Sequence, residues 1–414
     1  MTVKRTGALA GLRVLDMSRV LAAPWAGQFL ADLGADVIKV ERPGTGDDGR
    51  GYGSAPMGKD GQPIPGAAAF HLVANRNKRS LTVDLTTPQG QQVIRELIPH
   101  MDVLLENFLP GVMARFGLDY DAVHKLNPRL VYCSLTGYGH GGLYSDRPGY
   151  DAVFQAQSGM MAVTGLPDGV PGGGPMKTGP SYVDVTTGWT ATVGILAALS
   201  YRDRISGEGQ HVDAALMDTA VYLQSHVVQE YLVTGAQPQR NGTATLASHP
   251  ARVFRAADGY IFISAAVQQQ YVKFCKLLAI PQLSEDPRFA TSQLRHEHRE
   301  LWNSIVEPVI ATRRRRELLD ELVGAKVPCA LVNSYDEVFA DPHVQGRGLK
   351  VRMDHELAAS GAIDMIASPV RLSASPVAYE LRPPLLGEHT DEVLEELLGW
   401  DAARIAAARD SGAI

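Results

Sequence analysis

The amino-acid sequence predicts an α/β fold, in which a large domain with a parallel sheet is joined to a smaller α+β domain. Predicted strands and helices alternate from residue 12 to residue 135, as they do in parallel sheets covered by helices. The chain has 414 residues, more than the roughly 250–300 at which a single core stops growing. After Gly235 the pattern changes to a polar, proline-containing stretch followed by a hairpin, which indicates a second domain.

The first predicted unit is a strand, a helix and a second strand. An apolar strand spans Leu12–Met17, apolar residues at helical spacing span Trp25–Leu33, and a second strand spans Ala35–Glu41. Pro24 suits the first turn of the helix, and Gly34 is typical of the residue that ends one. A strand–helix–strand unit of this kind opens a doubly wound α/β fold.

The same alternation continues along the chain. The glycine-rich region from Gly137 to Pro180 is too irregular for one element, and two long helices are predicted after it, over Thr186–Asp203 and Val212–Val233. Before that region, the predicted strands are 80–85, 102–106 and 130–135, and the predicted helices are 89–97, 110–116 and 120–126.

The rest of the chain predicts a small domain and a return to the large one. Arg252–Ala256 and Tyr260–Ser264 indicate a hairpin, Cys329–Val332 a strand and Glu388–Leu398 a helix. Further helices are predicted at about 268–278, 297–311 and 314–324. We assign residues 1–205 and 326–414 to the large domain, 206–224 to a linker helix and 225–325 to the small domain.

Composition excludes several classes of protein. The net charge is −6 with acidic and basic residues interleaved, unlike the basic stripe of a nucleic-acid-binding protein. No apolar run approaches the ~18 residues of a membrane span, and Met1–Leu9 has no signal-peptide core. The three cysteines and twelve histidines show no metal-binding spacing. We expect a cytoplasmic protein that binds no metal, nucleic acid or membrane.

Two common kinds of site are missing from the sequence. The turn Asp16–Pro24 lacks the G-x-G-x-x-G pattern that lets a dinucleotide pyrophosphate approach the backbone. The G-x-S-x-G elbow of α/β-hydrolases is absent, and Cys133 lies in an apolar strand, where a core role is expected. A ligand is still expected at the carboxyl ends of the strands, where open α/β sheets bind them.

Basic residues follow several of the predicted strands. Each one alone is typical of a solvated surface charge, but as a group they indicate a phosphate-binding edge of the sheet. Asn107 and Phe108 also follow a strand and offer an amide and a ring to a ligand. The basic residues are Arg19, Arg42, Arg115 and those of the run Asn75–Arg79.

Asp184 stands where a long helix is predicted to begin. In one interpretation it is an N-cap, whose carboxylate accepts hydrogen bonds from free backbone N–H groups. In the other it is a nucleophile, because the positive end of the helix dipole supports developing negative charge. Spacing in the sequence leaves both interpretations open.

Taken in order, these segments resemble the class III CoA-transferases, also called the CaiB/BaiF family. The resemblance implies a Rossmann-like large domain built from both chain ends, a smaller domain between long linkers, and a homodimer of interlocked chains. The matching stretches are Gly11–Asp16, Leu30–Gly44, Arg76–Ser80, Glu106–Gly111, Thr136–Gly139, Gly149–Asp151, Asp184–Gly188, Gly194–Leu199, Met217–Asp218 and Leu385–Thr390.

The resemblance also implies the residues of the site. Asp184 matches the family's catalytic aspartate, and a coenzyme A thioester is implied as a substrate, with no tightly bound cofactor. The residues that match CoA contacts are Arg19, Arg42, Lys78, Asn107, Phe108, Arg115 and Tyr138. Candidate contacts of the carboxylic acid substrate are Tyr150, Met217, His249 and Arg252.

The implied reaction is covalent. The Asp184 carboxylate, ionised at neutral pH if its pKa is the usual ~3.9, attacks the acyl-CoA carbonyl and releases CoA thiolate from a mixed anhydride. The thiolate then attacks the aspartyl carbonyl to give an enzyme–CoA thioester, and an acceptor carboxylate repeats the steps in reverse. Backbone N–H groups around Asp184 or in the Gly172–Gly174 loop are the expected oxyanion donors, each typically worth ~2.7–4 kcal/mol.

Two alternative functions remain open. The family also contains α-methylacyl-CoA racemases, in which the histidine of a Gly-His-Asp motif pairs with the catalytic aspartate. Here the motif carries Tyr150, whose pKa near ~10 makes it a poor base, and we therefore favour transfer over racemisation. The other alternative is a catalytically inactive CoA-binding protein.

The small domain bears on the choice of substrate. Formyl-CoA transferases carry a glycine-rich flap there, and no run of glycines occurs between residues 240 and 270. Ala247–Phe254 instead resembles family members that use dicarboxylates such as succinyl-CoA. His249 or Arg252 would then pair with the distal carboxylate, unless both have structural roles.

Overall fold

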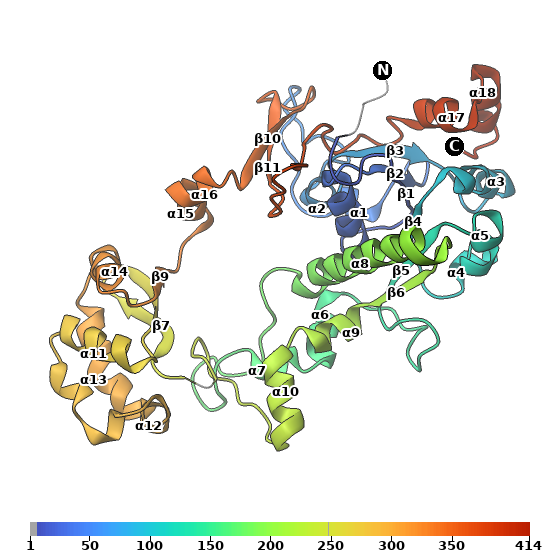
Figure 1. The fold of residues 1–414 in the computed structure, drawn as a ribbon. Coiled ribbons are helices and arrows are strands. Elements are labelled where there is room, and N and C mark those ends of the chain that lie inside the picture. The colour runs from blue at the N-terminus through green and yellow to red at the C-terminus, as the bar shows by residue number, and fades with distance from the viewer. Residues whose placement is uncertain (1–5, 247) are drawn as a thin grey trace. The chain divides into compact units, whose positions relative to one another are not determined.

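The computed structural model describes residues 6–246 and 248–414, so Ala247 of the segment 247–254 lies outside the described residues. The chain divides into two compact units, which are described separately (Figure 1). Unit 1 comprises residues 1–158, 179–224 and 345–414, and unit 2 comprises residues 159–178 and 225–344. Unit 1 is assembled from both ends of the chain.

Unit 1 is built on a six-stranded parallel sheet in the order β3-β2-β1-β4-β5-β6 (Figure 1). The chain order reverses between β1 and β4, so the edge beyond these two strands is the topological switch point at which α/β folds bind ligands. The strands are β1 (Arg13–Asp16), β2 (Asp36–Glu41), β3 (Lys78–Thr82), β4 (Val103–Glu106), β5 (Val131–Thr136) and β6 (His211–Ala215).

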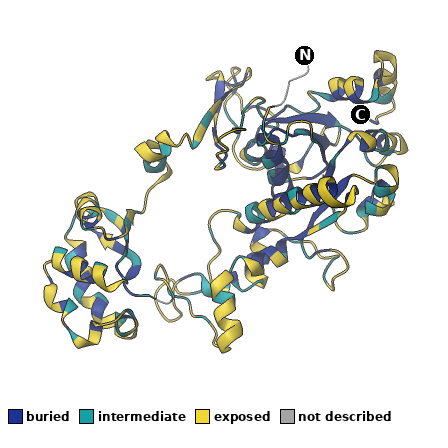
Figure 2. Cartoon of the chain, viewed as in Figure 1, coloured by how far each residue is buried: buried dark blue, intermediate teal, exposed yellow. Residues whose placement is uncertain are grey.

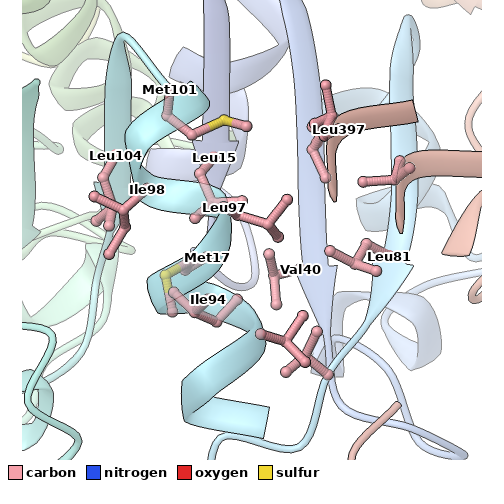
Figure 3. Close-up of a cluster of buried hydrophobic side chains, with 14 of the residues drawn as sticks. Leu15, Met17, Val40, Leu81, Ile94, Leu97, Ile98, Met101, Leu104 and Leu397 are labelled. Carbon is pink, nitrogen blue, oxygen red and sulfur yellow. The ribbon is translucent and has the colours of Figure 1, made fainter. Parts of the chain in front are cut away.

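Apolar side chains cover one face of this sheet and hold the C-terminal part of the chain against it. Val93, Ile94 and Leu97 recur at helical spacing on α3 (Pro88–Leu97) and therefore point to one side. They pack in one cluster with α17 (Thr390–Leu398) and the sheet, and each fully buried leucine or isoleucine there contributes roughly 1.5–3 kcal/mol. Figure 3 labels Leu15, Met17, Val40, Leu81, Ile94, Leu97, Ile98, Met101, Leu104 and Leu397 of this cluster.

Two long helices, α1 (Ala22–Asp32) and α8 (Tyr182–Tyr201), pack against each other on the other face. Gly188 allows their close approach, because a Cβ there would lie 2.5 Å from the carbonyl oxygen of Ala22. One π-helical turn, Arg202–Ser206, then leads from α8 to β6. Because a crossover helix runs antiparallel to the strands it connects, the N-terminus of α8 lies at the carboxyl edge of the sheet.

The prediction of one long helix over Val212–Val233 is wrong. His211–Ala215 is strand β6, which pairs with β5, and it is followed by α9 (Leu216–Tyr222) and α10 (Ser225–Thr234). Strand β6 is the edge strand of the sheet, and its pairing with β5 outweighs the short helical pattern in its own sequence. Residues 206–224 therefore form no linker helix, and they belong to unit 1.

The remaining elements of unit 1 cover its margins. They are α2 (Ala69–Ala74), α4 (Val112–Arg115), α5 (Tyr120–Leu126), α6 (Asp151–Gln157), α18 (Ala402–Asp410), β10 (Lys350–Asp354) and β11 (Ala362–Ile366). The last two form a two-stranded antiparallel sheet. None of the helices in the described part of the chain is both long and apolar enough to cross a membrane.

Unit 2 is an α+β unit around a three-stranded antiparallel sheet in the order β7-β8-β9. The predicted hairpin is confirmed as β7 (Ala251–Ala256) and β8 (Gly259–Ser264). The predicted strand at 329–332 is confirmed as β9 (Cys329–Leu331), but it pairs with β8, and residues 326–344 therefore belong to unit 2. The helices are α7 (Met160–Val163), α10, α11 (Gln268–Leu277), α12 (Ser292–Glu297), α13 (Arg299–Ala311), α14 (Arg315–Gly324) and α15 (Tyr335–Ala340), with α16 (Pro342–Gly346) at the boundary.

Candidate active site

Three of the predicted CoA contacts meet at the switch point, on the loops that follow β1 and β4. The backbone N–H of Arg19 donates to Asn107 Oδ1 (2.9 Å), and Asn107 Nδ2 donates to the carbonyl of Arg19 (2.8 Å). The Arg19 guanidinium lies 5.0 Å from the centre of the Phe108 ring. The backbone N–H of Phe108 donates to Glu106 Oε2 (2.8 Å), which fixes the turn. An exposed cation, an amide and a ring are thus held side by side.

The loop after β1 has a strained backbone and is held in place by hydrogen bonds to Asp47 and Lys39. Val20 has a φ of +70°, a left-handed conformation that a β-branched residue rarely adopts. Its N–H donates to Asp47 Oδ1 (2.9 Å), and Lys39 Nζ both donates to the carbonyl of Ser18 (2.9 Å) and pairs with Asp47 Oδ2 (2.8 Å). Strain of this kind persists where surrounding contacts over-determine it, which is common at functional sites. The shape of the loop is therefore set before a ligand arrives.

Arg42, Arg115 and Tyr138 lie on other segments of unit 1 near strand ends. Arg42 directly follows β2 and is exposed, and Arg115 is the exposed last residue of α4. Tyr138 follows β5 and is half-buried, with its hydroxyl donating to Gln157 Oε1 (2.6 Å) and its ring 5.2 Å from that of Phe154. The two arginines are open to solvent, as contacts to phosphates would need.

The structure contradicts the prediction that Lys78 contacts CoA. Its side chain has no exposed surface, and its three Nζ protons are used by Asp16 Oδ2 (2.7 Å), the carbonyl of Pro24 (2.8 Å) and Asn75 Oδ1 (3.0 Å). The same holds along the basic run, where Arg76 pairs with Asp32 and Arg79 pairs with Asp36. These cations hold the sheet and α1 together and are not available to a phosphate.

Asp184 lies in the first turn of α8, but it does not cap the helix. The N-cap residue is Ser181, whose side chain makes no capping hydrogen bond. The cap comes instead from Asp151, the first residue of α6, whose Oδ2 accepts the N–H groups of Val183 (2.7 Å) and Asp184 (3.1 Å). The capping interpretation of Asp184 is therefore wrong, and its carboxyl is left for another task.

The ionisation of Asp184 differs from the expected one. Burial raises the pKa of its carboxyl, and the negative charge of Asp151 adds to the effect, so that the pKa reaches about 7. The expectation of an ordinary pKa near ~3.9 assumed a solvated carboxyl. A carboxyl that titrates near neutral pH and lies at the ligand-binding edge of the sheet is a candidate catalytic group.

Four of the expected oxyanion donors are already used within the protein. The N–H groups of Gly173 and Gly174 donate to carbonyl groups of their own loop, at 2.8 and 3.2 Å. Those of Val183 and Asp184 donate to Asp151. These four groups do not face an open oxyanion position, because a donor already paired with an acceptor must break that bond first.

Two of the candidate substrate contacts lie in unit 1. The side chain of Tyr150 is 71% exposed at the start of α6, next to Asp151 in the sequence. Met217, in the first turn of α9, is half-buried and its N–H donates to the carbonyl of Gly137 (3.0 Å). Tyr150 lies in the segment that follows β5, and Met217 comes soon after the end of β6. Their contacts with substrate stay predictions.

The other two lie in unit 2, and the structure contradicts one of them. His249 is 2% exposed and its ring meets Trp302 edge-on at 4.6 Å. Burial lowers the pKa of His249 to about 3, so the ring is neutral and cannot pair with a carboxylate as a cation. Arg252 is half-buried, pairs with Glu307 (3.0 Å) and lies over the ring of Phe254. Its contact with substrate stays a prediction.

Sequence reasoning missed three polar residues that shape the site. Asp151 caps α8, Gln155 donates to Asp151 Oδ1 (2.5 Å), and Glu106 holds the turn that carries Phe108. Burial raises the pKa of Glu106 to about 7. Asp151 belongs to the motif Gly149–Asp151, in which only the tyrosine was considered. Its spacing of four residues from Gln155 places the two on one helix face, and this spacing could have indicated their hydrogen bond.

Comparison with known proteins places these features in a family. The model of CoA-transferase family III matches residues 9–390. A succinate–glutarate CoA-transferase of Agrobacterium fabrum is 41% identical over 94% of this chain and 95% of its own, and the human succinyl-CoA:glutarate CoA-transferase is 36% identical over 98% and 90%. The crystal structure of a CaiB/BaiF family protein from Brucella suis matches with a TM-score of 0.84 and 37% identity, covering 95% of this chain and 100% of that one.

These matches span both units and agree with the α/β fold built on a parallel sheet. This chain and the Brucella suis protein share one fold along nearly their whole length. The chain therefore belongs to CoA-transferase family III, and it is an enzyme that transfers coenzyme A between acyl-CoA thioesters and carboxylic acids.

Proposed function

We propose that transfer proceeds by covalent catalysis on Asp184, through an aspartyl mixed anhydride and an aspartyl–CoA thioester. The observation that supports it most directly is a half-buried carboxyl with a pKa of about 7, held in the first turn of α8 at the ligand-binding edge of the sheet. The carboxyl is freed from capping by Asp151, and a nucleophile needs that freedom.

The chemistry follows from the charge of the reacting groups. Ionised Asp184 attacks the carbonyl carbon of the acyl-CoA, the C–S bond breaks, and CoA leaves as a thiolate. The thiolate then attacks Cγ of Asp184, and the donor acid leaves as a carboxylate. Because the pKa is about 7, a large fraction of the carboxyl is ionised at neutral pH, and a carboxylate of this basicity is a better nucleophile than an ordinary aspartate.

The carboxyl edge of the sheet supplies groups suited to CoA. We propose that the exposed guanidinium groups of Arg19, Arg42 and Arg115 bind its phosphates, because a guanidinium group can donate two parallel hydrogen bonds to phosphate oxygens. Phe108 offers an aromatic face beside Arg19, and Asn107 keeps the two together. Tyr138 is proposed as a further contact from the loop after β5.

Dicarboxylic acids of four or five carbons are the proposed substrates. The supporting observation is the pair of relatives above, which are named for succinate or succinyl-CoA and glutarate. Arg252 is the proposed partner of the distal carboxylate, and it would exchange Glu307 for the substrate. No observation favours racemisation, since the motif carries Tyr150 in place of the histidine and the side chain of Tyr150 is exposed.

We further propose a homodimer of interlocked chains. None of the ten residues of α10 is buried, although the helix carries Val227, Val228 and Leu232, and Figure 2 draws most of it as exposed. On α8, Val193 is 66% exposed and Trp189 is 40% exposed. Helices of this composition are normally covered, and a second copy of the chain would cover them. Sedimentation analysis of the full chain should therefore give twice the monomer mass.

Trapping of the covalent intermediate tests the proposed function. The full-length enzyme is incubated with succinyl-CoA or glutaryl-CoA and no acceptor, and its intact mass is measured. An increase equal to CoA minus water is expected, and hydroxylamine should convert the adduct to a hydroxamate at Asp184. Acetyl-CoA and formyl-CoA are expected to label far less. Absence of any adduct with every donor, from an enzyme that turns over once an acceptor is added, would refute covalent catalysis.

A substitution at Asn107 tests the CoA-binding loop. Asn107→Leu removes both hydrogen bonds to the backbone of Arg19, each worth about 0.5–1.5 kcal/mol, and should raise the KM for acyl-CoA roughly tenfold while kcat changes less than threefold. Steady-state kinetics at varied acyl-CoA gives both values. Asn127→Leu, in which the amide binds backbone carbonyls away from the switch point, is the matched control and should leave KM unchanged.

A further inference from the structure

Asp151 is joined to the first turn of α8 by one oxygen of its side chain and to Gln155, on its own helix α6, by the other. Its Oδ2 accepts the N–H groups of Val183 and Asp184, and its Oδ1 accepts Gln155 Nε2 (2.5 Å). Asp151 is 8% exposed and Gln155 is 0% exposed. A buried carboxylate with three hydrogen bonds is rigid, so the position of Asp184 relative to α6 is fixed by this one side chain.

Asp151 is also the charge that acts on Asp184. The negative charge of Asp151 disfavours ionisation of Asp184, because like charges repel each other. Among the described elements packed against α8, the cations are Arg202 and Arg204, in the turn at its C-terminal end, whereas Asp184 lies in its first turn. The other charged or titratable groups on those elements are Asp32 of α1, Tyr132 and Cys133 of β5, Asp203 of the turn, His211 and Asp213 of β6, and Asp218 and Tyr222 of α9.

These other groups are engaged elsewhere or exposed. Asp32 pairs with Arg76, His211 lies 2.9 Å from Ser134 Oγ, and Asp213 Oδ2 accepts the N–H of His140. Asp218 is exposed in the first turn of α9. The neighbourhood of Asp184 therefore contains one negative charge that is both close and held in place.

We propose that Asp151 is a positioning residue that orients Asp184 and, through its negative charge, directs the thiolate to the Asp184 carbonyl of the mixed anhydride, so that the substrate carboxylate leaves. This inference rests on the covalent route proposed above and adds the group that sets its direction. The enzyme–CoA thioester is thereby favoured over free enzyme and acyl-CoA.

The direction follows from the two carbonyl carbons of the anhydride. When thiolate attacks Cγ of Asp184, a C–S bond forms, the bond from Cγ to the bridging oxygen breaks, and the substrate carboxylate leaves with that oxygen and its electron pair. When thiolate attacks the other carbonyl, the Asp184 carboxylate leaves and acyl-CoA is regenerated. The less basic carboxylate is the better leaving group. Asp151 makes Asp184 the more basic of the two, so the substrate carboxylate leaves.

Asp151→Asn separates charge from position. Asparagine retains an oxygen that accepts the N–H groups of α8 but carries no charge. At a fixed ratio of succinyl-CoA to succinate, the ratio of enzyme–CoA thioester to free enzyme, measured by intact mass, should fall threefold to tenfold. The acid limb of the kcat/KM profile should move to lower pH, because Asp184 then loses its proton more easily. A purely structural role would lower activity without moving that limb.

Two further variants make the test specific. Asp401→Asn neutralises an aspartate that also accepts a helix N-terminal N–H group, as the N-cap residue of α18 with Oδ1 accepting the N–H of Arg404 at 2.8 Å, and should change neither the ratio nor the limb. Asp151→Glu restores the charge and should return both readouts toward the wild-type values. Should Asp151→Asn not fold, Asp151→Ser offers a second neutral acceptor.

The outcomes distinguish this inference from the function on which it rests. A wild-type enzyme that turns over without any CoA adduct overturns the covalent route itself. A wild-type enzyme that forms the adduct, with neutral variants at Asp151 that show its ratio and its acid limb unchanged, overturns only the role assigned to Asp151.

Discussion

Asp184→Ala is expected to lower CoA transfer by on the order of 10⁴-fold or more, because no other carboxyl can form the anhydride at that position. Binding of acyl-CoA should survive with an affinity within about threefold of the wild-type value. The reason is structural: Arg19, Asn107 and Phe108 are held by bonds among themselves and to Glu106, none of which involves Asp184. Turnover and calorimetric titration with acyl-CoA measure the two effects separately.

A carboxylate on the same edge of unit 1 provides the control. Asp218 is exposed in the first turn of α9, and Asp218→Ala should keep transfer within a few-fold of the wild-type rate. Retention of normal turnover by Asp184→Ala would remove the nucleophile from the mechanism. Loss of both turnover and acyl-CoA binding would show that Asp184 holds the fold of the site instead.

Most of the framework was predictable because its signals are local. The strand at 13–16, the helix after Pro24 and its end at Gly34 follow from apolar spacing and from the backbone preferences of two residues. The hairpin of unit 2 follows from alternation around Ala257–Gly259. Strand β6 was missed because its five residues are recognisable as a strand only through their pairing with β5, whose paired residues lie 79 positions earlier in the sequence.

The polar residues also divide into those that local signals predict and those whose surroundings depend on distant parts of the sequence. Arg19, Asn107 and Phe108 were found because each follows a strand end, and parallel strands bring their ends together. The burial of His249 and Lys78 was not predictable, since it depends on Trp302 and Asp16, which are distant in the sequence. The pKa of Asp184 likewise depends on burial and on Asp151. A sequence names ionisable groups, while the fold sets their charge.

Lys78→Met is expected to lower the free energy of unfolding by about 3–5 kcal/mol, because it leaves the Asp16 carboxylate buried without its cation. Both side chains of this pair have 0% exposure, and the ammonium also bonds Pro24 and Asn75. Chemical unfolding, followed by circular dichroism, measures the loss. Lys350→Met, which breaks an exposed pair with Asp364 in the same unit, should cost no more than about 1 kcal/mol.

The double variant Asp16→Asn, Lys78→Met tests the cause of that loss. With both charges removed, no buried charge is left unpaired, and most of the stability should return, whereas a loss due only to packing would persist. The KM for acyl-CoA should stay near the wild-type value in the double variant, because Lys78 does not reach solvent. A stable Lys78→Met enzyme with a raised KM would give the opposite answer and restore Lys78 as a CoA contact. Stability and KM together therefore decide whether this lysine belongs to the framework or to the substrate site.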